Sequence, residues 1–132
     1  MPRMEDGEPA GPDGVRVVRM PGCVDVGNAM DVRAALAGEL RDGVRVLVAD
    51  LAGTASLALE GLQVLVLVRA AAARRGAELR LAAARPAVAR YLKLTGTART
   101  FPLYDSVDRA RAAGHPAGSR LRPARSGCPP AG

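Results

Sequence analysis

The chain has few aromatic residues, cysteines and histidines, and each shortage excludes a class of function. Its 132 residues include one Phe, two Tyr and no Trp, so it lacks a set of aromatic side chains on which nucleic-acid bases could stack. The two cysteines, Cys23 and Cys128, and the single histidine, His115, do not have the spacing of a metal site. We therefore expect no metal and no other cofactor. We interpret the cysteines as reduced thiols, with a disulfide between them as an alternative that the sequence does not support.

A membrane span and a secretory signal are also missing from the sequence. Arg69 follows the apolar residues 64–68 directly, and this run is too short to cross a bilayer. Residues 1–14 carry acids and prolines rather than the basic and apolar regions of a secretory signal. These features predict a cytoplasmic protein that does not bind membranes.

The residues that nucleophilic catalysis requires are absent as well. The histidine lies beside Pro116, no Gly-x-Ser-x-Gly elbow occurs, and no glycine-rich loop is followed by the lysine of a phosphate site. Asp25 and Asp50 might be considered a pair of carboxylates. Each is expected at the carboxyl end of a strand, where an aspartate accepts hydrogen bonds from loop amides. We predict that the protein is not an enzyme.

The net charge of +6 does not indicate specific nucleic-acid binding. Residues 114–132 contain Arg120, Arg122 and Arg125 and no acid, which accounts for three of the six charges. The remaining charge is spread over helix faces. Every basic residue except Lys93 is an arginine, which together with abundant Ala and Gly is typical of a GC-rich genome. We predict no specific DNA or RNA partner.

Strand and helix patterns alternate along the chain and predict an α/β domain over residues 15–113. Residues 44–51 are almost continuously apolar, as in a parallel strand covered on both faces. Residues 1–14 are predicted to be a flexible arm and residues 114–132 a disordered basic tail. Further strands are expected at 15–20, 77–81 and 101–104. Helices are expected from Asn28, as N-cap, to 42–43, at 60–75, from Pro86 to Gly96, and from Asp105 or Ser106 to Ala113.

Three segments in order resemble the STAS domain of bacterial anti-sigma factor antagonists. Residues 15–29 resemble a strand followed by the family's GELDxxNA, with Cys23 in place of Glu, and residues 91–113 resemble its LxLTGLxxxFxxYxSxxxAL ending. Against the family's VDLSGVTFLDSSGL the matches without a gap are Asp50, Leu51, Gly53, Leu57, Gly61 and Leu62. The resemblance implies the STAS fold, a small mixed, mostly parallel sheet with helices packed on it.

The resemblance also implies a site for a partner. The family's Asp-Ser-Ser-Gly, whose second serine is phosphorylated, reads Ala-Leu-Glu-Gly at 58–61, so Glu60 replaces the phosphoacceptor and cannot be phosphorylated. The family binds an anti-sigma factor, a kinase of the histidine-kinase-like ATPase type, at the loops that follow the strands at 15 and 44. The partner-binding residues implied here are Asp25, Val26, Asn28, Ser56, Leu57, Ala58, Leu59, Glu60, Gly61 and Leu62.

Several alternatives remain open at these positions. Glu60 is either a partial mimic of the phosphate or simply a favourable acid in the first turn of a helix. Leu59 takes a position suited to an N-cap Ser or Asp, and an exposed leucine there could anchor a partner. Thr54 and Ser56 are the nearby hydroxyls. Ser56 is interpreted as a polar loop substitution, and the alternative is that one of these hydroxyls is a replacement phosphosite. We predict a non-enzymatic regulator that binds an anti-sigma factor or another regulatory protein; the alternative is a scaffold subunit of a stress-sensor or lipid-transporter complex.

Overall fold

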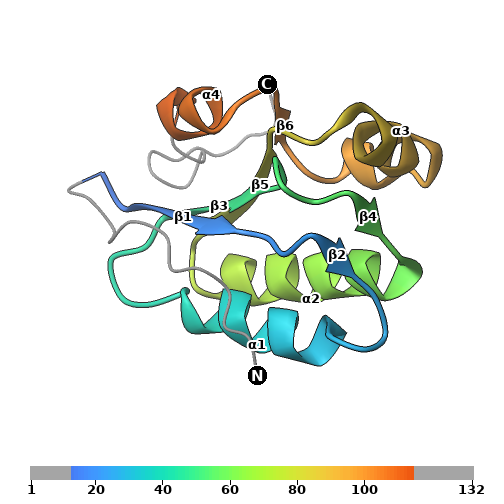
Figure 1. Ribbon diagram of the computed structural model, residues 1–132. Helices are drawn as coiled ribbons and strands as arrows, with labels where there is room; N and C mark the ends of the chain where they lie inside the picture. The colour runs from blue at the N-terminus through green and yellow to red at the C-terminus, as the bar shows by residue number, and fades with distance from the viewer. Residues whose placement is uncertain (1–12, 115–132) are drawn as a thin grey trace.

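Strand β3 (Val46–Asp50) lies inside a four-stranded sheet with the order β1-β3-β5-β6 (Figure 1). Its neighbours are β1 (Val15–Arg19) and β5 (Glu78–Ala82), and β6 (Leu103–Tyr104) pairs with β5 at the edge. The computed structural model describes residues 13–114, and every strand pairing within this range is parallel. The predicted α/β fold with a mostly parallel sheet is confirmed.

Helices cover both faces of this sheet (Figure 1). Val46 and Val48 of β3 join a small apolar cluster with Ala110 on one face, whereas Leu47 and Ala49 join the larger core on the other face. This alternation explains why the sequence of β3 is apolar at successive positions. The helices are α1 (Ala29–Gly38) and α2 (Leu59–Arg74) over the larger core, α4 (Val107–Ala112) over the smaller cluster, α3 (Pro86–Leu94) beside β4, and the 3-10 helix η1 (Thr97–Arg99).

The predicted ends of three helices agree with the structure. Pro86 opens α3 in the first turn, where its missing N–H costs no hydrogen bond. Ser106 caps α4, because its Oγ accepts a hydrogen bond from the Arg109 N–H at 3.1 Å. The chain leaves α2 through Gly76 in the left-handed region, with φ +74, and the N–H of Ala77 donates to the carbonyl of Ala72 at 2.8 Å.

The end of α1 was predicted wrongly. The apolar spacing favoured a helix continuing to 42–43, but α1 ends at Gly38. Leu40 is buried as expected, yet it reaches the core from the turn after the helix. In that turn the Glu39 carboxylate accepts a hydrogen bond from Arg16 Nε of β1 at 2.6 Å. The four-residue spacing of apolar residues could not show that the helix stops at Gly38 and that Glu39 bonds to Arg16 instead.

Most of the predicted arm and tail lies outside the described residues, and those predictions remain untested. Two residues of the predicted arm, Asp13 and Gly14, belong to the described part. The Gly14 carbonyl accepts hydrogen bonds from the N–H groups of Arg45 at 2.7 Å and Val46 at 3.2 Å. The backbone pairing beside β1 therefore includes Gly14.

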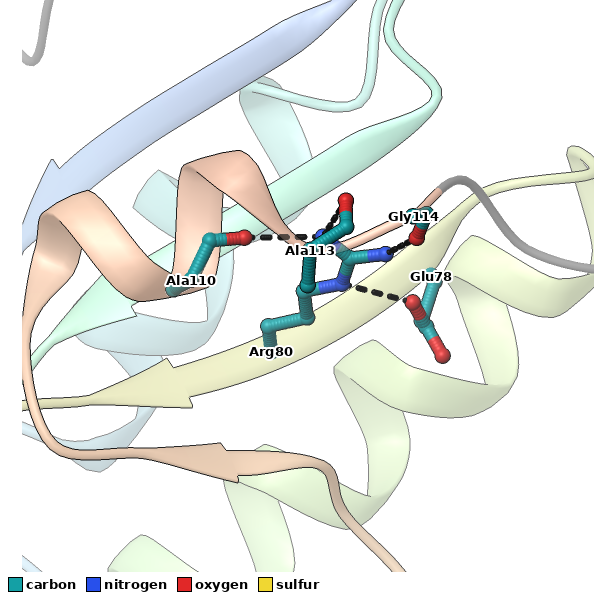
Figure 2. Close-up of polar contacts among 5 residues, drawn as sticks. All are labelled: Glu78, Arg80, Ala110, Ala113 and Gly114. Atoms are coloured by element: carbon teal, nitrogen blue, oxygen red, sulfur yellow. Dashed lines mark hydrogen bonds and ion pairs between the residues drawn. The ribbon is translucent and has the colours of Figure 1, made fainter.

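A buried arginine on β5 fastens the C-terminal end of α4 to the sheet (Figure 2). Arg80 is 2% exposed, and its Nη1 donates to the carbonyls of Ala110 at 2.8 Å and Ala113 at 3.2 Å. Its Nη2 donates to the Gly114 carbonyl, and its Nε pairs with the Glu78 carboxylate at 2.7 Å. Carbonyls at the end of a helix lack partners within the helix, so a cation that supplies several donors there satisfies both their hydrogen bonding and the helix dipole. The sequence pattern of β5 did not reveal this role.

We expect Arg80→Met to lower the free energy of unfolding by about 2–4 kcal/mol, since it removes buried charge-assisted hydrogen bonds while retaining much of the side-chain volume. Arg74→Met is the control: it removes an exposed arginine in the last turn of α2 and should cost less than about 0.5 kcal/mol. Urea unfolding of the two variants measures both effects. Equal losses would show that the bonds of Arg80 contribute nothing specific to stability.

Candidate functional site

A second, two-stranded sheet builds the candidate site, and the sequence analysis did not find it. Strand β2 (Cys23–Val24) pairs in parallel with β4 (Ser56–Leu57), with Cys23 opposite Ser56 and Val24 opposite Leu57. No strand was predicted between the strand at 44–51 and the helix at 60–75. A strand of two residues is too short for an alternating pattern to reveal it. The pairing brings together the two segments that were expected to meet.

The loop between β2 and α1 is tied together by its own polar side chains. The Asp25 carboxylate accepts a hydrogen bond from the Gly27 N–H at 2.9 Å. Asn28 stands at the N-cap position of α1 but makes no capping bond; instead its Oδ1 accepts from the Asp25 N–H at 3.0 Å and its Nδ2 donates to the Cys23 carbonyl at 2.8 Å. Asn28 therefore has the predicted N-cap position, but the predicted capping hydrogen bond is wrong, because its side chain bonds to the preceding loop instead of to the helix.

Asp50 has the structural role that the sequence analysis gave it. Its carboxylate accepts a hydrogen bond from the Ala52 N–H at 2.9 Å, just beyond β3. Asp25 makes the corresponding bond beyond β2. Each carboxylate thus stabilises the loop that follows its own strand, as predicted.

Gly61 allows α2 to approach the small sheet closely. A Cβ on Gly61 would lie 2.5 Å from Leu57 Cδ1 and 3.1 Å from Val24 Cβ. Both neighbours are buried, Val24 completely, so neither has open space into which to move. The glycine therefore fixes the distance between the beginning of α2 and the β2–β4 pair.

Helix α2 begins at Leu59, and its N-cap position belongs to Ala58. We had expected Leu59 to take that position, so this assignment is corrected by one residue. The methyl side chain of Ala58 cannot accept a hydrogen bond, but its N–H donates to the Val24 carbonyl at 2.8 Å. Leu59 is 60% exposed, and Glu60 is half-buried in the first helical turn. The helix start is thus held by backbone pairing with β2 and lacks a side-chain cap.

The ten predicted partner-binding residues divide into a scaffold and a surface. Leu57, Gly61 and Leu62 are buried and hold the site together. Asp25, Val26, Ser56 and Leu59 are exposed, while Asn28, Ala58 and Glu60 are half-buried. The buried residues therefore act through packing, and only the exposed and half-buried ones are available to a partner.

Two exposed residues of α1 were not predicted for the site. Met30 and Asp31 lie in the first turn of α1, and Met30 is 69% exposed. Helices α1 and α2 begin at the same end of the molecule, next to β2 and β4 (Figure 1). The sequence did offer one signal: Met30 is a large apolar residue outside the four-residue spacing of Val32, Leu36 and Leu40. We call the surface at this end the docking edge; its residues are Asp25, Val26, Met30, Asp31, Leu59 and Glu60.

One of the two alternative hydroxyls is inaccessible. Thr54 is completely buried, and its Oγ1 donates to the Pro21 carbonyl at 2.8 Å. Ser56 is exposed on β4. Of the pair, Ser56 alone presents a hydroxyl at the surface.

A known domain family matches the sequence across this fold. The profile of the STAS domain matches residues 8–110. The chain belongs to the STAS domain family. No curated protein sequence matches this STAS domain.

Solved structures that resemble this STAS domain include anti-sigma factor antagonists and a transporter family protein. It is 31% identical to an anti-sigma factor antagonist from Mycobacterium paratuberculosis, with a TM-score of 0.65, covering 75% of this chain and 84% of that chain. A candidate anti-sigma factor antagonist from Thermotoga maritima is 25% identical, with a TM-score of 0.67 and coverage of 75% and 86%. A sulfate transporter family protein from Wolinella succinogenes shares the fold at 18% identity, with a TM-score of 0.66 and coverage of 78% and 91%.

Two further features of the STAS domain bear on its chemistry. Among the described helices, none combines the length and apolarity that crossing a membrane requires. Within residues 13–114, no group of three or more His, Cys, Asp or Glu side chains is arranged to hold a metal ion.

We expect Gly61→Ala to destabilise the domain by about 1–2 kcal/mol, because the added methyl group overpacks the contact with Leu57 and Val24. The higher helix propensity of alanine, about 1 kcal/mol, acts in the opposite direction and is included in this value. Gly53→Ala is the control, since a Cβ at Gly53 would meet no atom within 4 Å. Thermal unfolding compares the two; equal melting temperatures would contradict the close approach.

Proposed function

We propose that this STAS domain is a cytoplasmic, non-enzymatic regulator that binds an anti-sigma factor at its docking edge and has lost the phosphorylation switch. The observation that carries the proposal is the place of Glu60. It lies in the first turn of α2 and directly precedes Gly61, the position that the phosphorylated serine takes in the family's Asp-Ser-Ser-Gly. The anti-sigma factor expected is a kinase of the histidine-kinase-like ATPase type, and the process regulated is transcription in a bacterium.

The composition of the docking edge supports a protein partner. Val26 and Leu59 are 78% and 60% exposed, and two exposed acids lie near Val26: Asp25 beside it and Asp31 in the first turn of α1. Protein interfaces combine apolar anchors that lose contact with water and a rim of polar groups. The edge offers both. The likeness to the Wolinella transporter protein, at 18% identity, supports the fold alone, and no observation favours the scaffold alternative.

A carboxylate at Glu60 sets the binding state permanently. A phosphate at a helix N-terminus is tolerated within the domain, because free amides and the positive end of the helix dipole face it. The cost arises at the interface, where the partner must remove the charge from water. Glu60 carries one charge, without the second charge and tetrahedral oxygens of a phosphate. It therefore mimics the phosphorylated form in part, and neither ATP nor a phosphatase can change it.

Substitutions at Glu60 test the mimicry. We expect Glu60→Ser to lower the dissociation constant for the anti-sigma factor of the neighbouring gene by at least about tenfold. The reason is that formation of the interface no longer removes a charge from water. Glu60→Gln should have a smaller effect in the same direction. Asp108→Ser is the matched control, since it removes an exposed acid from the first turn of α4. Isothermal titration calorimetry gives the affinities.

Tight wild-type binding that Glu60→Ser leaves unchanged would contradict the mimicry and identify a constitutively active antagonist. Leu59→Ser tests the neighbouring position in the same experiment. Weaker binding would mark Leu59 as an anchor, provided that Leu94→Ser, which removes another exposed leucine at the end of α3, has no effect.

Loss of the switch has a separate test. Incubation with the anti-sigma kinase and ATP should add no phosphate at residues 54–60, because Thr54 is buried and positions 59 and 60 carry no hydroxyl. The exposed Ser56 lies in β4, away from the helix start where the family's phosphoacceptor stands. Intact-mass and peptide analysis measure the phosphate. Ser56→Ala is the matched variant: stoichiometric phosphate on the wild type that disappears in this variant would show that the acceptor has moved to Ser56.

A further inference from the structure

Helix α2 turns an apolar face to the solvent. It lies beside α1 on one side of the sheet (Figure 1). Three large apolar side chains of α2 are exposed by 60%, 51% and 46%: Leu59, Val66 and Leu67. Single exposed apolar residues are common on soluble proteins, whereas several on one helix face indicate a surface that binds another molecule.

The spacing of the exposed residues forms a continuous line along the helix. Steps of three and four residues alternate through five positions of α2, as they do along the contact line of a coiled coil. Ala70 in this line is small, so a second helix can approach closely. We call this surface the α2 seam; its residues are Glu60, Gln63, Leu67, Ala70 and Arg74, with Val66 beside Leu67.

The charges of the α2 seam lie only at its two ends. Glu60 lies seven residues before Leu67 and Arg74 seven residues after it, so each is about 10 Å from the middle along the helix axis. The residues between these ends include one charged side chain, Arg69. Its guanidinium group lies 5.8 Å from the ring centre of the buried Phe101, so it is directed away from the seam.

The two end charges are available to another molecule. Neither Glu60 nor Arg74 forms an ion pair with a described residue, whereas the neighbouring Arg75 pairs with Asp42 at 3.3 Å. Arg74 is exposed and Glu60 is half-buried. The seam thus combines an apolar middle with an acid at one end and a base at the other end.

A surface of this kind is complementary to itself when it is reversed. Two copies of α2 that pack antiparallel about a two-fold axis at Leu67 bring the two Leu67 side chains together. Glu60 of each copy then stands opposite Arg74 of the other copy, which gives two equivalent ion pairs. A parallel arrangement would instead oppose like charges. Two-fold dimers are the commonest symmetric oligomers, and their interface is one surface that fits itself.

We infer that the α2 seam is the interface of a homodimer in which the α2 helices run antiparallel. Leu59 and Glu60 also belong to the docking edge, so the dimer covers part of the surface proposed for the anti-sigma factor. Self-association therefore competes with that partner. The competition rests on the proposed function; the dimer does not.

The interface is small, which makes the dimer weak. Helix α2 has 16 residues and is about 24 Å long. A pair of such helices buries less than the roughly 800 Å² per partner of a standard protein interface. We therefore expect a dissociation constant of about 10–100 μM, so that the dimer exchanges with the monomer and responds to the concentration of the chain.

Sedimentation equilibrium of the full chain measures the dimer, with a reducing agent present because Cys23 is exposed. The average mass should rise from 13.6 kDa towards twice this value with concentration. Leu67→Glu places two carboxylates at the two-fold axis and should raise the dissociation constant at least about a hundredfold. Leu94→Glu is the matched control, since it changes an exposed leucine at the end of α3 and should have no effect.

Charge reversal tests the antiparallel pairing. Glu60→Arg and Arg74→Glu should each raise the dissociation constant at least about tenfold, because like charges then oppose each other at both ends. The variant with both changes should dimerise like the wild type. An equal mixture of the two single variants should form a mixed dimer, although each alone is monomeric at the same concentration. Arg74 lies outside the docking edge, so Arg74→Glu weakens the dimer without changing a residue proposed to bind the anti-sigma factor.

Each of three results would overturn the inference. A mass that stays at 13.6 kDa up to about 1 mM would show that no dimer forms. A dimer that Leu67→Glu leaves intact would place the interface on another surface. Single charge reversals without effect, or a mixture that fails to dimerise, would contradict the antiparallel pairing, whether or not Leu67→Glu folds. Since no anti-sigma factor is present in these samples, the outcome is independent of whether such a partner binds.

Discussion

The burial of β3 on both faces is the constraint on which the other elements depend. A strand that is apolar at four successive positions, as β3 is from Val46 to Ala49, needs a cover on each side, and α1 with α2 supplies one while α4 supplies the other. Parallel neighbours require crossover connections, so the carboxyl ends of all four strands point to one end of the sheet. The loops that carry the docking edge lie at this end because of that arrangement. The position of the site is a consequence of how the core is covered.

The site itself depends on a few short-range contacts at this end. The β2–β4 pair joins two segments that are about thirty residues apart, and Gly61 lets α2 approach this pair without a side chain between them. Buried residues such as Leu57 and Leu62 fix the geometry, and the exposed Leu59 beside the half-buried Glu60 meets the solvent. The buried residues thus hold the site in place, and the side chains that they leave exposed form the surface that a partner can contact.

The C-terminal end of the domain is connected to the same sheet by Arg80. Its guanidinium group binds the Ala110 carbonyl of α4 and the carbonyls of the two residues that follow the helix, and it also lies 5.7 Å from the centre of the Tyr104 ring. A buried cation of this kind is stabilised only where its donors find partners, and here three carbonyls and Glu78 supply them. The contact fixes the C-terminal end of α4 against β5.

The sequence by itself determined the order of the large elements and the interior position of β3, because apolar periodicity and turn residues are local signals. Its resemblance to the STAS family indicated the residues around Gly61. It also indicated that Glu60 has no hydroxyl to phosphorylate. The tertiary structure decided what depends on contacts between distant residues: the β2–β4 pair, the shorter α1, the backward bonds of Asn28 and the burial of Arg80 and Thr54. A contact between residues that are far apart in the sequence leaves no periodic pattern, so only the packed structure could reveal it.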